Sequence, residues 1–274
     1  MLTIANPARE RLAAGELSVG VGVRLSRTVE IAKAMRVAGF DWLFLDLEHG
    51  IMTLDTAAQI ATAAIDTGIS PIVRVPYGEF AMATRMLDNG ALGIIIPHVD
   101  TAAEAEEIAR RLRLPPLGHR SLGGSSAALG WGSYGVREAS EALNAANLLV
   151  VMLETPQAIE NADAIASVDG IDVLLIGTND LAAEMGIPGE FEHERIVAAY
   201  RRLIEVCRKR GKWPGMGGIY HPPLMQRYIE MGARFLLGGS DIAFVQAGAA
   251  ARAGFLRGLT LPPTETVPAA AAAS

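Results

Sequence analysis

Short apolar runs alternate with longer amphipathic stretches along most of the chain. Runs of this kind, bounded by polar or turn residues, are typical of buried strands. Eight of them predict strands at residues 18–25, 42–46, 71–75, 93–96, 148–153, 173–176, 213–216 and 235–237. Each is followed by a predicted helix, in order at residues 28–37, 54–66, 79–88, 101–113, 156–166, 191–210, 222–231 and 241–256.

This alternation predicts an α/β fold, a (β/α)8 TIM barrel. The runs are apolar without strict alternation, as expected of parallel strands covered by helices. A doubly wound sheet is the alternative, but the length and the count of eight units favour the barrel. We expect one barrel domain over residues 1–260, an extra leading helix within residues 1–17, and an Ala/Pro-rich tail over residues 261–274.

Composition narrows the class of protein. Half of the 274 residues are apolar, which allows a large core, and the net charge of −6 disfavours nucleic-acid binding. The single cysteine, Cys207, excludes a disulfide framework. The first twenty residues lack the apolar segment of a signal peptide, and no apolar run is long enough for a membrane span. We therefore expect a cytoplasmic protein that does not enter membranes.

One connection, residues 114–147, is long and rich in Gly and Pro. Loops of such length are usually functional or disordered. The pattern does not determine whether this segment covers the end of the barrel where the strands finish.

Polar residues gather where the predicted strands end. Catalytic groups of a (β/α)8 barrel sit at these C-terminal ends, so the residues there are site candidates. Burying two carboxylates and an imidazole unpaired at the end of one strand is costly, so Asp46, Glu48 and His49 indicate a wall of an active site rather than a structural feature. The candidates are Arg24, Asp46, Glu48, His49, Arg74, His98, Glu154, the loop 177–180 and the segment 238–241.

Glu154 and Asp180 are the best metal candidates, because each lies just past one of two neighbouring strands. Two carboxylates leave most of an octahedral shell to water and substrate, an arrangement common for Mg²⁺ and Mn²⁺. The alternative is that both acids cap the helices that follow. A zinc site finds little support, because no histidine pair has ligand spacing.

Three further residues have both a catalytic and a structural interpretation. Arg74 lies inside an apolar strand and requires an anionic partner, either a protein carboxylate or a substrate. His49 is an acid/base candidate, since imidazole titrates near neutral pH; alone it would be a hydrogen-bonded loop residue. Asp88 is a possible acidic partner for His49, although the pattern alone favours a helix terminus.

The lysines disfavour a Schiff-base mechanism, which requires a lysine on a strand. Only Lys33, Lys209 and Lys212 occur, one in a predicted helix and two ahead of a strand. Electrophilic activation would then come from a metal.

Several of these residues stand in motifs that resemble the HpcH/HpaI aldolases, the metal-dependent class II pyruvate aldolases. Residues 40–49, FDWLFLDLEH, are similar to the family's FDWLLIDGEH stretch. Further matches follow in the same order at residues 71–76, 86–91, 114–120, 154–155 and 177–181. The similarity runs from about residue 20 to residue 250, and the ordered set is specific although no single motif is.

The resemblance implies a (β/α)8 barrel in a homohexamer whose last helix is exchanged between subunits. It implies cleavage of 4-hydroxy-2-oxo acids to pyruvate, or a related 2-oxo acid, and an aldehyde, and the reverse addition. It implies Glu154 and Asp180 as ligands of Mg²⁺, Mn²⁺ or Co²⁺, His49 as the base, and Asp88 as the acid that raises its basicity. It also implies that Arg74 stabilises the enolate oxygen and that backbone N–H groups in the loop Gly177, Thr178, Asn179 and Asp180 hold the carboxylate. We interpret Asp46 and Glu48 as supports of His49.

Departures from the family pattern concern the aldehyde half of the substrate. Met152 stands where the family often has a substrate-contacting Gln, and Arg24 stands roughly at the family's Trp in the first strand. We hypothesise that Arg24 favours an acidic aldehyde. The rival functions are a citrate-lyase-β-like lyase acting on a CoA thioester, for which no basic patch is found, and a barrel that binds oxo acids without turnover.

Overall fold

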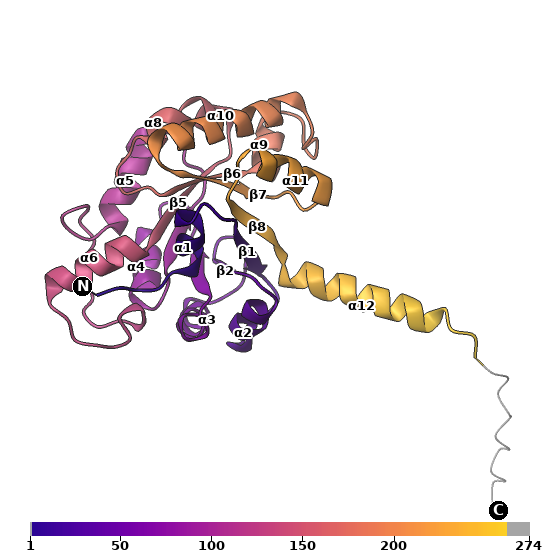
Figure 1. Ribbon diagram of the computed structural model, residues 1–274, viewed down its shortest axis with the longest axis horizontal. Coiled ribbons are helices and arrows are strands. Elements are labelled where there is room, and N and C mark those ends of the chain that lie inside the picture. The colour runs from indigo at the N-terminus through magenta and orange to yellow at the C-terminus, as the bar shows by residue number, and fades with distance from the viewer. Residues whose placement is uncertain (1, 262–274) are drawn as a thin grey trace, which may run out of the picture.

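The computed structural model describes residues 2–261 and contains a closed barrel of eight parallel strands (Figure 1). The strands are β1 Ser18–Val23, β2 Trp42–Asp46, β3 Ser70–Arg74, β4 Gly93–Ile96, β5 Leu148–Leu153, β6 Val173–Gly177, β7 Trp213–Gly217 and β8 Phe235–Ser240. Each strand pairs with the next, and β8 pairs with β1. The predicted TIM barrel is therefore confirmed, and the doubly wound sheet is excluded, because that sheet would leave two edges unpaired.

Most helices surround the barrel and bury one face against it, whereas the first and the last are placed differently. They are α1 Pro7–Ala13, α2 Glu30–Val37, α3 Leu54–Thr67, α4 Phe80–Asp88, α5 Ala102–Leu112, α6 Val136–Ala146, α7 Pro156–Glu160, α8 Ala162–Ala166, α9 Thr178–Glu184, α10 Glu194–Arg210, α11 Pro222–Met231 and α12 Asp241–Arg257. The largest apolar cluster fills the space between the strands and this ring of helices. None of the helices in residues 2–261 is long and apolar enough to cross a bilayer.

The leading helix α1 closes the N-terminal mouth of the barrel. Ala8 and Leu12 pack on the apolar residues of the barrel interior, including Trp42. The backbone N–H of Ala8 donates to Ser70 Oγ at 3.0 Å, at the start of β3. The predicted extra helix is thus present but shorter than residues 1–17. Because α1 closes the N-terminal mouth, only the C-terminal mouth is open for a site.

The segment 114–147 is not one long loop, which corrects the expectation from its Gly and Pro content. It contains a 3-10 turn at Ala127–Leu129 and the amphipathic helix α6. Leu129 and Leu143 pack with Leu92 and Leu114 beside the start of β4, at the N-terminal end of the barrel. In this chain the segment therefore lies away from the C-terminal strand ends.

Two smaller differences concern helix boundaries. The helix predicted over residues 156–166 is split into α7 and α8 at Asn161, whose side chain donates to the Asp100 carbonyl at 2.7 Å. The helix α9 follows β6 directly, in a region predicted as loop.

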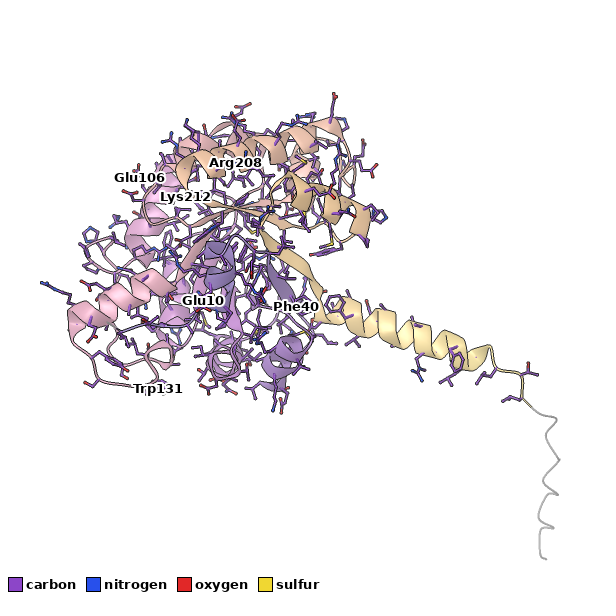
Figure 2. The ribbon with its side chains drawn as sticks, in the orientation of Figure 1. Glu10, Phe40, Glu106, Trp131, Arg208 and Lys212 are labelled. Carbon is purple, nitrogen blue, oxygen red and sulfur yellow. The ribbon has the colours of Figure 1, made fainter. Side chains whose placement is uncertain are left out.

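The last helix, α12, projects from the body of the barrel (Figure 1). Of its seventeen residues only Asp241 is buried. Apolar side chains along it remain in water, among them Val245, Phe255 and Leu256. At its root Phe244 stacks on Phe40, with ring centroids 6.0 Å apart; Figure 2 labels Phe40 beside this junction. The predicted tail beyond residue 261 lies outside the described residues.

Candidate active site

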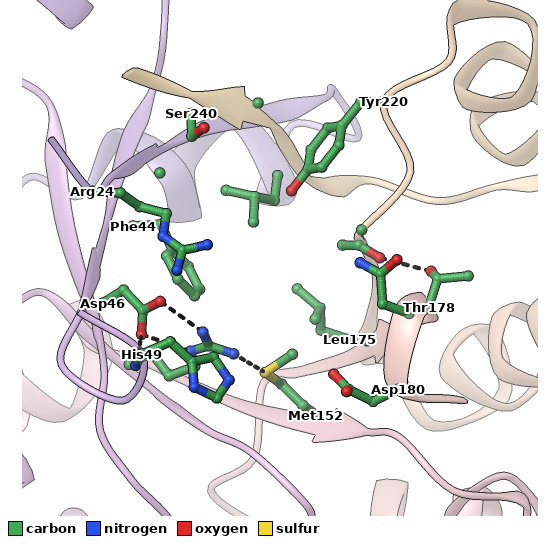
Figure 3. A pocket seen from close by; sticks show the side chains of 18 residues that line it. Arg24, Phe44, Asp46, His49, Met152, Leu175, Thr178, Asp180, Tyr220 and Ser240 are labelled. Atoms are coloured by element: carbon green, nitrogen blue, oxygen red, sulfur yellow. Dashed lines mark hydrogen bonds and ion pairs between the residues drawn. The ribbon is translucent and has the colours of Figure 1, made fainter. Parts of the chain in front are cut away.

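A cavity of about 250 Å³ opens at the C-terminal ends of the strands (Figure 3). Convergence there follows from the topology, because all eight strands are parallel and end at one mouth. Most of the residues predicted from the strand-end pattern line it: Arg24, Asp46, His49, Arg74, Gly177, Thr178, Asn179 and Asp180. Met152, singled out by comparison with the family motif, lines it too. Glu48 and Glu154 lie immediately behind this wall and contact lining residues or their neighbours.

Arg74 is fixed in the wall by two carboxylates. β2 and β3 place Asp46 directly beside Arg74 in register. Arg74 Nε and Nη2 donate to the two Asp46 oxygens at 3.0 and 2.7 Å, and Nη1 forms an ion pair with Glu48 Oε2 at 3.0 Å. The guanidinium lies over the Phe44 ring, 5.0 Å from its centroid, and the residue is 8% exposed. Its position is set before any substrate binds.

Asp46 also shapes the turn that carries His49. Its Oδ1 accepts the backbone N–H groups of Glu48 and His49 at 3.1 and 3.2 Å. Burial acts against ionisation, but the hydrogen bonds and charge of Arg74, with those two N–H groups, hold the pKa of Asp46 below its usual value. The Asp46 carboxylate therefore stays charged, and both of its oxygens are engaged by Arg74 and the turn.

His49 lies at the rim of the cavity with its side chain 57% exposed. Its Nε2 is 3.6 Å from Glu48 Oε2, so Glu48 is placed between the imidazole and Arg74. An accessible imidazole beside a carboxylate can exchange a proton with a bound molecule.

Glu154 is the most deeply buried acid of the site, at 1% exposure. Its Oε2 accepts the backbone N–H of His98 at 2.8 Å and lies 3.1 Å from His98 Nδ1. Burial raises the pKa of Glu154 to about 7, and the nearby Asp180 charge adds to this effect. The capping alternative does not hold for Glu154, because Thr155 caps α7. Asp180 does lie in the first turn of α9.

The surroundings of Glu154 and Asp180 fit a divalent cation. A Cβ at Gly177 would come within 2.3 Å of Glu154 Oε1, so only glycine leaves room for this carboxylate. Burial and the Asp180 charge both act against an ionised Glu154, and a cation between the two carboxylates would offset both effects. Within residues 2–261 no group of three or more His, Cys, Asp or Glu side chains could hold a metal. A cation there would take its other ligands from water and a bound molecule.

His98, one of the candidates at the strand ends, contacts Glu154. It adopts a φ of +53°, a conformation that few non-glycine residues occupy. In this conformation both its N–H and its ring reach Glu154, and its Nε2 is 4.0 Å from Glu48 Oε1. Backbone strain of this kind is concentrated at functional sites.

Thr178 and Asn179 form the start of α9 beside the cavity. The Thr178 hydroxyl is hydrogen-bonded to Tyr200 Oη at 2.8 Å and donates to the Gly217 carbonyl at 2.7 Å. Only the backbone of Thr178 is therefore left for a ligand. The first N–H groups of a helix lack partners within it and attract anions.

Tyr220 lines the cavity and was missed in the sequence. It lies three residues after β7. An aromatic residue just past a predicted strand end could have been included among the site candidates. Ser240, at the end of β8, lines the same side, and the Arg24 side chain reaches in from the end of β1 (Figure 3).

Asp88 does not meet His49 within this chain. It ends α4, and helices of a barrel run back toward the N-terminal mouth, opposite the site. Its Oδ1 accepts from Arg120 Nη2 at 2.7 Å, and Gly123 packs against its carboxylate. This contact fits the helix-terminus interpretation. A role beside His49 would require a second chain and stays a prediction.

Comparison with known proteins decides the family. The family described as HpcH/HpaI aldolase/citrate lyase matches residues 24–245. The chain belongs to this family. The recognition made from the ordered motifs is confirmed, and with it the prediction of an enzyme of the aldolase type.

Individual relatives agree with this assignment. The chain is 37% identical over 265 residues to a 4-hydroxy-4-methyl-2-oxoglutarate aldolase of Hapsidospora irregularis, covering 95% of this chain and 98% of the relative. It is 37% identical to a 4-hydroxy-2-oxovalerate aldolase of Rhodococcus jostii, covering 86% and 90%. The crystal structure of an HpcH/HpaI aldolase from Desulfitobacterium hafniense superimposes with a TM-score of 0.88 at 29% identity, covering 93% and 98%.

Proposed function

We propose that this enzyme cleaves 4-hydroxy-2-oxo acids to pyruvate, or a related 2-oxo acid, and a carbonyl compound, and catalyses the reverse addition. One observation carries the proposal: the fixed guanidinium of Arg74 and the carboxylate of Asp180 line the same cavity, and the carboxylate of Glu154 lies directly behind its wall against Gly177. Together they provide the opposite charges needed to bind an oxo acid beside a cation. The names of the relatives, aldolases of 4-hydroxy-2-oxo acids, support the substrate class.

The donor half of the substrate would lie against Arg74 and α9. The N–H groups at the start of α9, from Thr178 to Asp180, would hold the carboxylate. Arg74 would donate to the oxygen on which enolate charge develops. A fixed donor aimed at developing charge lowers the barrier without reorganising during the reaction.

Glu154 and Asp180 would hold Mg²⁺, Mn²⁺ or Co²⁺, which when bound would supply further positive charge for the enolate. Because His98 engages Oε2, Oε1 of Glu154 would be the oxygen that takes the cation.

His49 would move the proton in the bond-breaking step. It accepts the proton of the 4-hydroxyl group while the C3–C4 bond breaks and the carbonyl compound forms. The electron pair of that bond passes into the enolate beside Arg74, and protonation at C3 gives pyruvate. Asp46 and Glu48 would support the step by holding Arg74 and His49 in place.

The proposal also includes self-association. Beyond Phe244, apolar side chains of α12 such as Val245, Phe255 and Leu256 are exposed, and exposed apolar surface of this extent marks an interaction site. We expect α12 to pack against another copy of the chain in a homo-oligomer such as a hexamer, as an exchanged helix.

Incubation with Mg²⁺, Mn²⁺ or Co²⁺, pyruvate and a panel of aldehydes tests the function. We expect metal-dependent C–C bond formation, and exchange of the C3 protons of pyruvate with solvent deuterium in the absence of any aldehyde. Absence of both would overturn the proposal. Cleavage of a CoA thioester without either reaction would point to a citrate-lyase type of enzyme instead.

A further inference from the structure

The two arginines of the cavity differ in how their charges are balanced. Arg74 is neutralised by Asp46 and Glu48, which contact it through all three guanidinium nitrogens. Arg24, by contrast, forms no ion pair with any residue between 2 and 261. The cavity therefore presents one uncompensated guanidinium to a ligand, and it is that of Arg24.

Arg24 shares its side of the cavity with two hydroxyl groups. Figure 3 shows Arg24, Ser240 and Tyr220 on one side, and Met152 and Asp180 on the other. The Tyr220 hydroxyl is directed into the cavity. Since the oxo-acid half is expected at Asp180 and Arg74, the side with Arg24 and Tyr220 is left for the carbonyl acceptor.

The charge state of Tyr220 suits a donor. Burial raises the pKa of Tyr220, and the positive charges of Arg24 and Arg74 act in the opposite direction. The phenol therefore keeps its proton at neutral pH and can donate to an anion. Arg24 and Tyr220 line the same cavity.

The backbone of Arg24 is held firmly for a residue at a rim. Asp241, buried at the start of α12, accepts the N–H groups of Arg24, Leu25 and Ser26 at distances between 2.7 and 3.0 Å. The loop that carries Arg24 is thus anchored at the junction of β8 and α12. The Asp241 carboxylate accepts hydrogen bonds from backbone N–H groups and does not pair with the Arg24 guanidinium.

We propose that Arg24 and Tyr220 bind a carboxylate on the carbonyl acceptor, so that the preferred substrates are 4-hydroxy-2-oxo diacids. A guanidinium and a phenol supply charge-assisted donors to one anion. The inference rests on the proposed function, because it assigns the acceptor half of that reaction.

The test uses acceptors that differ in charge but not in carbon number. Rates of pyruvate addition are measured with succinic semialdehyde against butanal, and with glyoxylate against acetaldehyde. We expect the wild-type enzyme to prefer the acidic member of at least one pair. Arg24→Gln should lower kcat/KM for that acceptor about ten- to hundred-fold, chiefly through KM, because a hydrogen bond to a charged group is lost. Tyr220→Phe should lower it about three- to ten-fold.

Neutral acceptors and control variants distinguish a loss of carboxylate binding from a general loss of activity. The preference for the acidic acceptor should collapse in Arg24→Gln and be kept in part by Arg24→Lys. Arg36→Gln on the exposed face of α2 and Tyr134→Phe outside this cavity should behave like the wild-type enzyme. An equal loss for acidic and neutral acceptors, or an unchanged preference, would overturn the inference.

Exchange of the C3 protons of pyruvate with solvent distinguishes failure of the carboxylate site from failure of the proposed function. A wild-type enzyme that exchanges the protons but adds only neutral acceptors would leave the aldolase standing and overturn the carboxylate site. A wild-type enzyme without exchange or addition would overturn the proposed function, and this inference with it.

Discussion

His98 holds Glu154 through both its backbone and its ring, with the N–H 2.8 Å and Nδ1 3.1 Å from the same carboxylate oxygen. The contact depends on the left-handed backbone of His98, at a φ of +53°. One oxygen of Glu154 is thereby oriented by the protein, and the other is left for a ligand. Residues that orient a metal ligand affect affinity strongly although they do not touch the metal.

Replacing His98 by glycine should separate the backbone contact from the ring contact. Gly keeps the positive φ and the N–H, so His98→Gly should fold normally. Loss of the ring should weaken Mn²⁺ or Co²⁺ binding about tenfold, measured by calorimetric titration. Unchanged affinity would show that the ring does not position Glu154.

Replacing the paired acids should remove cation binding. Glu154→Gln and Asp180→Asn should each lower divalent-cation affinity about a hundred-fold or more, because each removes one of two charged ligands. The matched control is Glu106→Gln, which changes an exposed acid on α5. Retained metal-dependent activity in Glu154→Gln would refute the ligand assignment.

The Asp46–Arg74 pair should contribute strongly to stability. Asp46→Asn leaves a buried guanidinium with only Glu48 as counter-charge, and should lower the free energy of unfolding by about 3 kcal/mol. The double variant Asp46→Asn/Arg74→Met should recover part of this loss, since it removes the unpaired charge. Urea denaturation with an unchanged m-value measures both. A single variant as stable as the wild-type protein would contradict the geometry.

The pH dependence of stability should report on Asp241. Burial opposes its charge, but the N–H groups of Ser26, Arg24 and Leu25 outweigh this and hold its pKa below the usual value. A depressed folded-state pKa stabilises the protein above the unfolded-state pKa of about 4, and the contribution is lost as the pH falls through the folded value. Asp241→Asn should therefore cost about 1–2 kcal/mol at pH 7 and progressively less below pH 4.

Urea unfolding of Asp241→Asn at pH 7, 5 and 3.5 measures this difference. Asp66→Asn, at an exposed position of α3, serves as the control and should show no such dependence. A destabilisation that stays constant across the three pH values would assign the effect to packing rather than to charge.

The projecting helix should determine the oligomeric state. Phe255→Glu places a charge among the apolar side chains of α12 and should shift the protein toward smaller species in analytical ultracentrifugation. Gln246→Glu changes a polar position of the same helix and should leave the state unchanged. An oligomer that persists in Phe255→Glu would place the contact elsewhere.

Local pattern determined the barrel and most of its site. Parallel strands covered by helices appear in the sequence as apolar runs. Because all the strands end at the same mouth, polar residues at strand ends, such as Arg74, Glu154 and Asp180, could be predicted to lie near one another before any distance was known. The helix α6 was also recoverable, since Ala139, Ala142, Leu143 and Ala146 recur at helical spacing. The glycines and prolines around it obscured that period.

Only the tertiary structure decided which partner each polar group takes. The pairing of Asp88 with Arg120 joins residues 32 positions apart at the opposite mouth of the barrel. The positive φ of His98 and the presence of Tyr220 and Arg24 in one cavity likewise depend on how separate segments pack. Periodicity records whether a residue faces the core or water, and it carries no information about which distant side chain lies beside it.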